Sequence, residues 1–210
     1  ASEIVPDGGV MKEKPTLLLL HGGPGLDHSG YKPAFSGLTD IAQVIYLDHR
    51  GNGRSDRGDP SRWSLAQWGD DVKGFCEALE IEKPIVFGNS FGGFVAMSYA
   101  ARHPGHAGKL IISSTRGNAD RKNRMIELFT QRGGPEIGEM ARTWHEEGLN
   151  PELIEAWGER AMPLYNQRPR PAFQGTIRST KVLMHFDGPS GEGRSFNLLP
   201  GLSAVQCPTL

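Results

Sequence analysis

The sequence has little cysteine and little net charge. It holds two cysteines among 210 residues, Cys76 and Cys207, which lie far apart and lack metal-ligand spacing. Such sparse cysteine is typical of a reduced, cytoplasmic protein and argues against a disulfide framework. The formal net charge is -1, so we expect no general attraction to nucleic acid or to an anionic membrane.

Long apolar runs and cofactor motifs are also missing. The run at residues 17–20 is far shorter than the roughly 20 residues that a membrane-spanning helix needs. Residues 1–6 lack the basic and apolar regions of a secretory signal. No G-x-x-x-x-G-K-[ST] motif is present, and Asp56 stands where a dinucleotide fingerprint starting at Gly51 needs its last glycine. We expect no cofactor or metal and a small-molecule or short-peptide substrate, and a homo-oligomer is compatible with the sequence.

Glycine (28) and proline (15) are instead plentiful, which indicates a compact core with many turns. In the first 112 residues, short apolar runs alternate with helical patterns, as is typical of βα units around a parallel sheet. The runs do not alternate apolar with polar residues, so the strands should be covered on both faces. We expect strands at 16–20, 44–47, 84–87 and 110–112.

Two helices are predicted between these strands. Ser64 and Gln67 have capping-box spacing, and apolar residues then recur every three or four positions, at Leu65, Trp68, Val72, Phe75 and Leu79. The second helix, from Phe91 to Arg102, is mostly apolar and rich in small residues, so it should lie buried against the sheet.

The chain becomes more polar after residue 116. Helical patterns near 122–132, 135–147 and 151–161 indicate a helical cap over 117–197, inserted into a core formed by 1–116. Residues 198–210 are expected to return to the core, because 205–210 resemble the opening of another strand.

The sequence Gly88-Asn89-Ser90-Phe91-Gly92 is the strongest chemical signal. It has G-x-S-x-G spacing between an expected strand and an expected helix. That context indicates a nucleophile elbow, in which a serine hydroxyl stands above the sheet at a helix N-terminus. We predict Ser90 as a catalytic nucleophile. The alternative is a glycine-rich turn in which Ser90 merely caps the helix.

The sequence His21-Gly22-Gly23-Pro24-Gly25 directly follows the first strong strand. A glycine-rich turn leaves backbone N–H groups available to a carbonyl oxygen, and we predict that the amides of Gly23 and Phe91 form an oxyanion hole. His21 is predicted to brace the turn by hydrogen bonds, because a general base would be on the wrong loop there. Asp48 and Arg50, after the strand at 44–47, are expected to form a buried network that braces these loops, since buried charges must be paired.

Taken together, HGGPG, DHRGNGRSD (48–56) and GNSFGG (88–93) resemble the α/β-hydrolase superfamily, and more narrowly its proline iminopeptidase-like branch. The resemblance covers residues 15–115 and, weakly, 191–210; Phe91 stands where iminopeptidases commonly have tryptophan. It implies an α/β-hydrolase fold, with a mostly parallel central sheet flanked by helices and an inserted helical cap. It also implies a serine hydrolase that cleaves an ester or amide through an acyl-enzyme.

The resemblance further implies a triad in the chain order Ser, Asp, His. The acid and the histidine should follow the strand that opens near Cys207, so both are expected beyond Leu210, in a chain truncated at both ends. Among the seven histidines, His185 near Asp187 is the least implausible substitute base, and Asp120 is an alternative acid. A base must be within hydrogen-bond reach of Ser90, which disfavours both.

Three functions stay open. The resemblance is strongest to a prolyl aminopeptidase, but an esterase, lactonase or C–C bond hydrolase on the same scaffold would differ only in the cap. Dehalogenases and epoxide hydrolases are disfavoured, because those relatives have aspartate at the elbow. A non-catalytic ligand receptor is the alternative of another class, since fold alone does not determine function.

Overall fold

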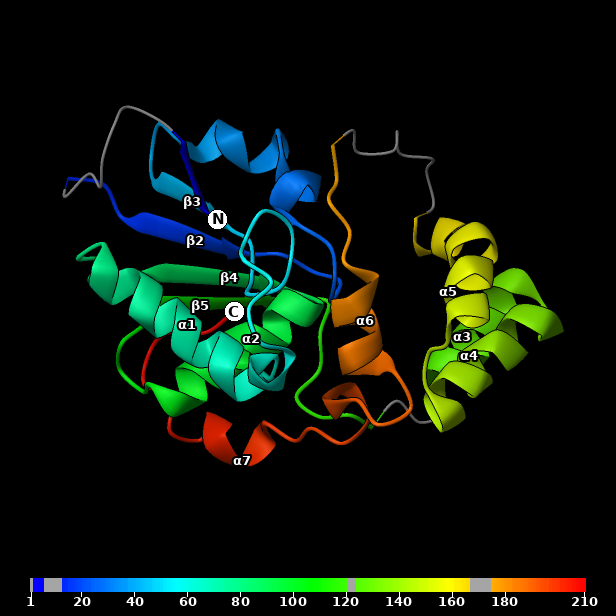
Figure 1. Cartoon of the computed structure of the whole chain (residues 1–210). Helices are drawn as coiled ribbons and strands as arrows, with labels where there is room; N and C mark the ends of the chain where they lie inside the picture. The colour runs from blue at the N-terminus through cyan, green and yellow to red at the C-terminus, as the bar shows by residue number, and fades with distance from the viewer. Residues whose placement is uncertain (1, 6–12, 121–123, 167–174) are drawn as a thin grey trace. The chain divides into compact units, whose positions relative to one another are not determined.

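The computed structural model describes residues 2–5, 13–120, 124–166 and 175–210. The chain divides into two compact units (Figure 1). The core unit comprises residues 1–118, 173–183 and 197–210, and the helical unit comprises 119–172 and 184–196. The outer limits of the helical unit lie within two residues of the predicted cap. Residues 173–183, which lie inside the range predicted for the cap, group with the core unit.

The core unit contains a five-stranded sheet in the order β1-β3-β2-β4-β5. The parallel strands are β2 (Thr16–Leu20), β3 (Gln43–Leu47), β4 (Ile85–Asn89) and β5 (Lys109–Ser113), as the sequence predicted to within two residues at each end. The sequence missed β1 (Ser2–Val5), which pairs antiparallel with β3. Four residues give too short a pattern to identify a strand, and β1 is recognised only by its partner.

Both faces of this sheet are covered. Leu17, Leu19, Val44 and Tyr46 share one face and pack against Tyr31, Phe35 and Leu38, which lie in or next to the short 3₁₀ helices η1 (His28–Tyr31) and η2 (Ala34–Leu38). The alternate residues Leu18, Leu20 and Val86 point to the opposite face and are also fully buried. Burial on both sides explains why the strands read as continuous apolar runs.

Helices α1 (Leu65–Ala78) and α2 (Phe91–Arg102) pack side by side (Figure 1). The Ser64 hydroxyl accepts a hydrogen bond from the Gln67 amide at 3.2 Å, as the capping spacing predicted. Gly69 permits the close approach of the two helices, since a Cβ there would lie 2.8 Å from the Tyr99 amide nitrogen. Further short helices of the core unit are η3 (Pro60–Arg62) and α7 (Leu199–Leu202).

The last three residues lie beside β5. The amide of Leu110 donates to the carbonyl of Pro208 at 3.0 Å, and the amide of Leu210 donates back to Leu110 at 3.0 Å. Ile112 also donates to Leu210, at 2.7 Å. The strand opening predicted at 205–210 therefore pairs with the sheet at 208–210, parallel to β5.

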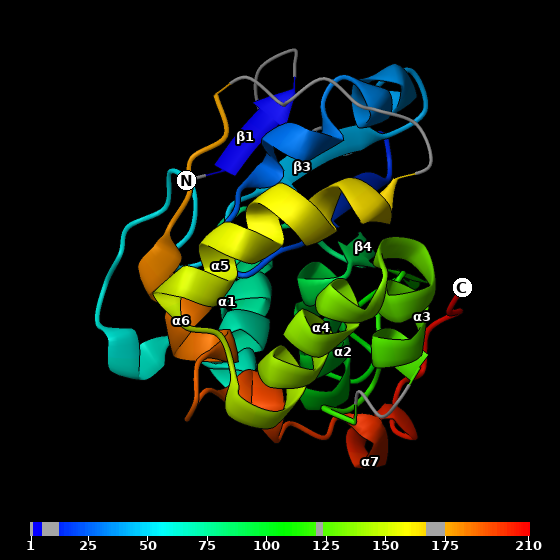
Figure 2. The same cartoon turned by 90° about the vertical axis from the view of Figure 1, so that its right-hand side faces the viewer.

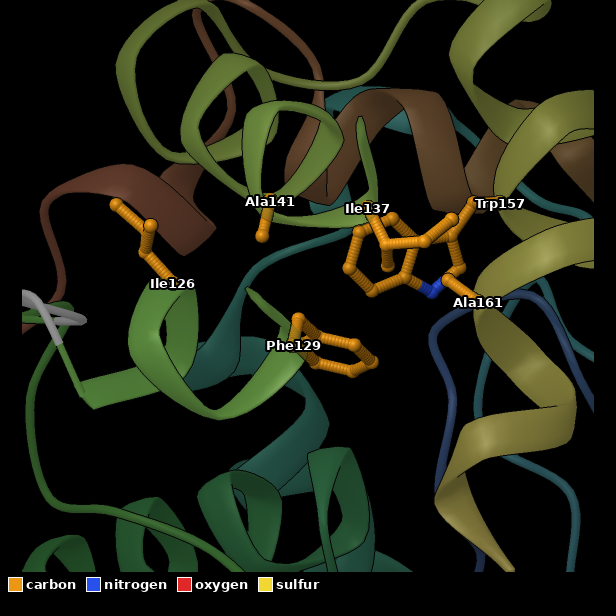
Figure 3. Close-up of a cluster of buried hydrophobic side chains, with 6 residues drawn as sticks. All are labelled: Ile126, Phe129, Ile137, Ala141, Trp157 and Ala161. Atoms are coloured by element: carbon orange, nitrogen blue, oxygen red, sulfur yellow. The ribbon is translucent and has the colours of Figure 1, made fainter. Parts of the chain in front are cut away.

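The helical unit is built from α3 (Arg124–Gly133), α4 (Pro135–Glu147) and α5 (Pro151–Ala156), with α3 and α4 side by side (Figure 2). The helix predicted at 151–161 changes character after Ala156, continuing as a π turn (Trp157–Ala161) and a 3₁₀ turn (Met162–Tyr165). The unit has its own apolar core (Figure 3), formed by Ile126, Phe129, Ile137, Ala141, Trp157 and Ala161.

Helix α6 (Thr180–Asp187) begins in the core unit and ends in the helical unit, which also holds the 3₁₀ turn η6 (Glu192–Arg194). Among the described residues, no helix combines the length and the apolarity needed to cross a bilayer.

Candidate active site

Ser90 occupies the sharp turn between β4 and α2. Its backbone has φ 53° and ψ −117°, a region that L-residues other than glycine rarely adopt. The side chain is exposed, does not cap α2, and makes no hydrogen bond with any described residue. Ser90 thus stands at the N-cap position of α2, but its side chain makes no capping hydrogen bond. A strained residue with an unused polar group at an element junction is typical of a functional site.

The two glycines that flank Ser90 are required by close packing. A Cβ at Gly92 would lie 2.0 Å from the carbonyl oxygen of Leu20. A Cβ at Gly88 would lie 2.4 Å from the carbonyl oxygen of Gly92 and 2.7 Å from the Ala96 side chain. These distances are too short for any side chain, so G-x-S-x-G spacing here reflects the packing of α2 onto β2 and β4.

The glycine loop, residues 22–26, contacts this turn. A Cβ at Gly22 would lie 3.2 Å from the Cβ of Ser90, so the loop and the elbow touch. Gly23 has φ +67°, and its carbonyl accepts a hydrogen bond from Leu26 at 3.0 Å. The amide of Gly23 donates to no group in the described part of the chain. The structure thus places Gly22, the residue before Gly23, against Ser90, and Phe91 follows Ser90 as the first residue of α2.

His21 is buried beneath the glycine loop. Its Nε2 accepts a hydrogen bond from the His49 amide at 3.3 Å, which leaves the proton on Nδ1, 3.1 Å from the Gly22 carbonyl. Burial lowers the pKa of His21, so the ring is neutral near pH 7. These bonds fit a bracing role and leave the ring no free nitrogen for a reacting group.

Asp48 is buried at the end of β3 and holds two loops together. Its Oδ1 accepts from the His28 amide at 2.9 Å and lies 2.8 Å from the His28 ring, and its Oδ2 accepts from the Arg54 amide at 2.8 Å. Burial alone would raise the pKa of Asp48, but these hydrogen bonds outweigh it and hold the pKa well below its usual range.

The expected pairing of Asp48 with Arg50 is wrong. Arg50 instead donates to both carboxylate oxygens of Asp71 on α1, with Nε at 2.7 Å from Oδ2. Both residues follow the end of β3 at Leu47, where the chain enters a turn and no longer alternates sides as a strand does. Asp48 points towards His28 and Arg50 towards α1. Each is a structural support, in a separate network.

Sequence analysis did not identify two further buried residues that bond to the glycine loop or follow it. Asn52 is fully buried, and its Oδ1 accepts from the Gly25 amide at 2.6 Å. Asp27 is also buried and accepts from Ile177, which lies 150 residues later in the chain. Asp27 ends the HGGPGLD stretch, but no local pattern could identify so distant a partner.

The lowered pKa of Asp48 predicts a loss of stability in acid. Its contribution is fully present above the ordinary carboxyl value of 3.8 and is lost as the pH falls towards the lowered pKa of the folded state. We expect Asp48→Asn to be less stable than wild type at pH 7 and pH 5. The difference in urea midpoint should narrow at pH 3, and an equal difference at all three values would contradict the assignment.

The histidines of the core unit have other partners. His28 contacts Asp48, His49 contacts His21, His103 contacts Asp70, and His106 contacts the Tyr99 hydroxyl. His145, His185 and Asp120 belong to the helical unit. None of the described histidines is hydrogen-bonded to Ser90. The described residues also contain no group of three or more histidine, cysteine, aspartate or glutamate side chains placed to hold a metal ion.

Comparison with known proteins places this geometry in a family. The family described as alpha/beta hydrolase fold matches residues 15–134, more than half of the chain. A proline iminopeptidase of Pestalotiopsis fici is 33% identical over 124 residues, which cover 58% of this chain and 43% of that protein. A 2-hydroxymuconate semialdehyde hydrolase of a Pseudomonas species is 34% identical over 103 residues, covering 48% of this chain and 36% of that protein.

The fold is also found in solved structures. The proline iminopeptidase of Mycobacterium smegmatis superposes with a TM-score of 0.64 at 17% identity, covering 99% of this chain and 75% of that one. This chain spans less than half the length of the two curated relatives named above. The matched segment holds the four parallel strands, the glycine loop and the Ser90 turn, and the chain belongs to the α/β-hydrolase fold family.

Proposed function

We propose that the chain carries the nucleophile and the oxyanion site of a serine hydrolase that cleaves an ester or amide bond of a small substrate. The observation that carries this proposal is the backbone of Ser90, held at φ 53° with an exposed and unbonded side chain. Strain of about 1–3 kcal/mol persists only where the surrounding structure imposes it. A strained turn that presents a hydroxyl at a helix N-terminus has an evident use in nucleophilic attack.

The proposed reaction is acyl transfer. The Ser90 oxygen adds to the substrate carbonyl carbon as a base takes its proton, and the amides of Gly23 and Phe91 donate to the resulting oxyanion. The proton passes to the leaving alcohol or amine as that bond breaks. Water then adds to the acyl-enzyme in the same way and releases the acid.

Ser90 needs a base and an acid to orient that base. In accord with the triad order of the superfamily, we propose an aspartate and a histidine outside residues 1–210 for these roles. The partial coverage of the curated relatives supports this assignment. No metal or organic cofactor enters the proposed mechanism.

A prolyl aminopeptidase activity is the first candidate, because the proline iminopeptidase of Pestalotiopsis fici is 33% identical to this chain over 124 residues. A different hydrolase on the same scaffold is the second, because a relative named 2-hydroxymuconate semialdehyde hydrolase matches at a similar identity. A receptor without catalysis is the remaining alternative, and the unbonded Ser90 hydroxyl argues against it.

Two measurements on the complete gene product test these proposals. A fluorophosphonate probe should label the protein at Ser90, and absence of labelling would favour the receptor. Hydrolysis of proline-naphthylamide compared with short acyl esters then separates an aminopeptidase from an esterase. An aminopeptidase should prefer the naphthylamide; the opposite preference would reject that candidate.

A further inference from the structure

Residues 175–179, which we call the strap, cross the glycine loop of the core unit. The amide of Ser179 donates to the carbonyl of Gly25 at 2.7 Å, and the amide of Ile177 donates to the Asp27 carboxylate at 2.9 Å. A Cβ at Gly25 would lie 2.4 Å from the Ser179 carbonyl oxygen. Strap and loop are therefore in direct backbone contact, although about 150 residues separate them in sequence.

Asp27 is the centre of this contact. Its Oδ1 accepts from the amide and the hydroxyl of Ser29, at 3.1 and 2.6 Å. Its Oδ2 accepts from Arg54 Nη1 and from the Ile177 amide, both at 2.9 Å. The side chain is fully buried. Burial would raise the pKa of Asp27, but the hydrogen bonds from Ile177 and Ser29 outweigh it, so the carboxylate is ionised near pH 7.

The glycine loop is held from its other side as well. The amide of Gly25 donates to Asn52 Oδ1 at 2.6 Å, while the turn from Gly23 to Leu26 closes with a 3.0 Å hydrogen bond. Gly23 has φ +67°, and its amide makes no hydrogen bond with the described residues. Because a displacement of about 1 Å can cost about 100-fold in rate, the anchors of this loop matter to any donor on it.

We propose that Asp27 is a positioning residue, whose carboxylate locks the strap onto the glycine loop and thereby sets the direction of the Gly23 amide. The inference rests on the proposed function, since Asp27 acts on the reaction only through that donor. In the sequence, the strap lies between the two parts of the helical unit, residues 119–172 and 184–196. The proposed oxyanion site of the core unit thus depends on the strap, which follows the first part of the helical unit along the chain.

Asp27→Asn tests the lock, because an asparagine has one acceptor oxygen where the two carboxylate oxygens now serve separate partners. Asp59→Asn is a matched control. Asp59 is exposed and caps η3 by accepting from the Ser61 amide at 2.9 Å, as Asp27 caps η1 through Ser29. The control therefore changes an equivalent cap at a distance from the strap network.

In the complete gene product we expect Asp27→Asn to lower kcat for a short acyl ester by about 10- to 100-fold, with KM within twofold of wild type. The rate of backbone amide hydrogen exchange should rise both in residues 22–26 and in residues 175–179. Asp59→Asn should change neither. Should Asp27→Asn fail to fold, Ser29→Ala removes the hydroxyl bonds to Asp27 and to Thr176 and is expected to shift the same quantities in a milder form.

Faster exchange in both segments with an unchanged kcat would overturn the positioning role and leave Asp27 a purely structural residue. Unchanged exchange would overturn the lock itself. A wild-type protein that hydrolyses no ester or amide and resists the fluorophosphonate probe would instead refute the proposed function. In that case exchange would still report whether Asp27 holds the strap.

Discussion

Replacing Ser90 with alanine is expected to lower kcat for ester hydrolysis by on the order of 10⁶-fold, because the proposed acyl-enzyme forms on the Ser90 hydroxyl. The substitution should leave the fold intact. The Ser90 side chain makes no hydrogen bond with the described residues and is exposed, so its loss creates neither a cavity nor an unpaired partner. Steady-state hydrolysis and fluorophosphonate labelling, both on the complete gene product, measure the effect.

Ser61→Ala provides the control for Ser90→Ala. Ser61 is exposed on η3, away from the elbow in sequence, and should retain wild-type rates and labelling. Substantial hydrolysis by Ser90→Ala, with thermal stability unchanged, would place the nucleophile elsewhere. Loss of hydrolysis together with loss of folded structure would be uninformative about chemistry, so circular dichroism accompanies the rate measurement.

Replacing Gly92 with alanine is expected to destabilise the core unit by about 3 kcal/mol or more. The new Cβ would lie 2.0 Å from the Leu20 carbonyl oxygen and 2.6 Å from that of His21. Both are backbone atoms at the end of β2, which cannot move aside as a flexible side chain could, so α2 must shift away from the sheet. Urea unfolding at pH 7 measures the free energy of unfolding of the variant and of wild type.

Gly74→Ala is the matched control, because it makes the same chemical change inside a helix of the same unit. Gly74 lies in α1, is exposed, and has open space around its Cβ position. Alanine has the higher helix propensity, so this variant should be more stable than wild type by about 0.5–1 kcal/mol. The two substitutions are expected to change the free energy of unfolding in opposite directions. A Gly92→Ala protein as stable as wild type would contradict the close packing of α2 on β2.

Much of the core could be predicted because its signals are local. The apolar run at Thr16–Leu20, the cap formed by Ser64, and the glycines around Ser90 each lie within a few residues of the feature that they specify. Hydrophobic periodicity, capping and turn geometry act over such distances. The contact between Gly22 and Ser90 follows from the pairing of β2 with β4, since parallel strands bring their carboxyl ends to one edge of the sheet.

The sequence by itself determined the succession of the four parallel strands and of α1 and α2 along the chain, the sharp turn at Ser90 and the glycine loop before it, because each depends on neighbouring residues. Only the tertiary structure decided three pairings. Strand β1 pairs with β3, Arg50 forms its ion pair with Asp71 rather than with Asp48, and the Ile177 amide of the strap donates to Asp27. The physical reason is that a buried charge or an unpaired backbone group must find some partner, while the sequence does not state which of several distant candidates the packing will bring within 3 Å.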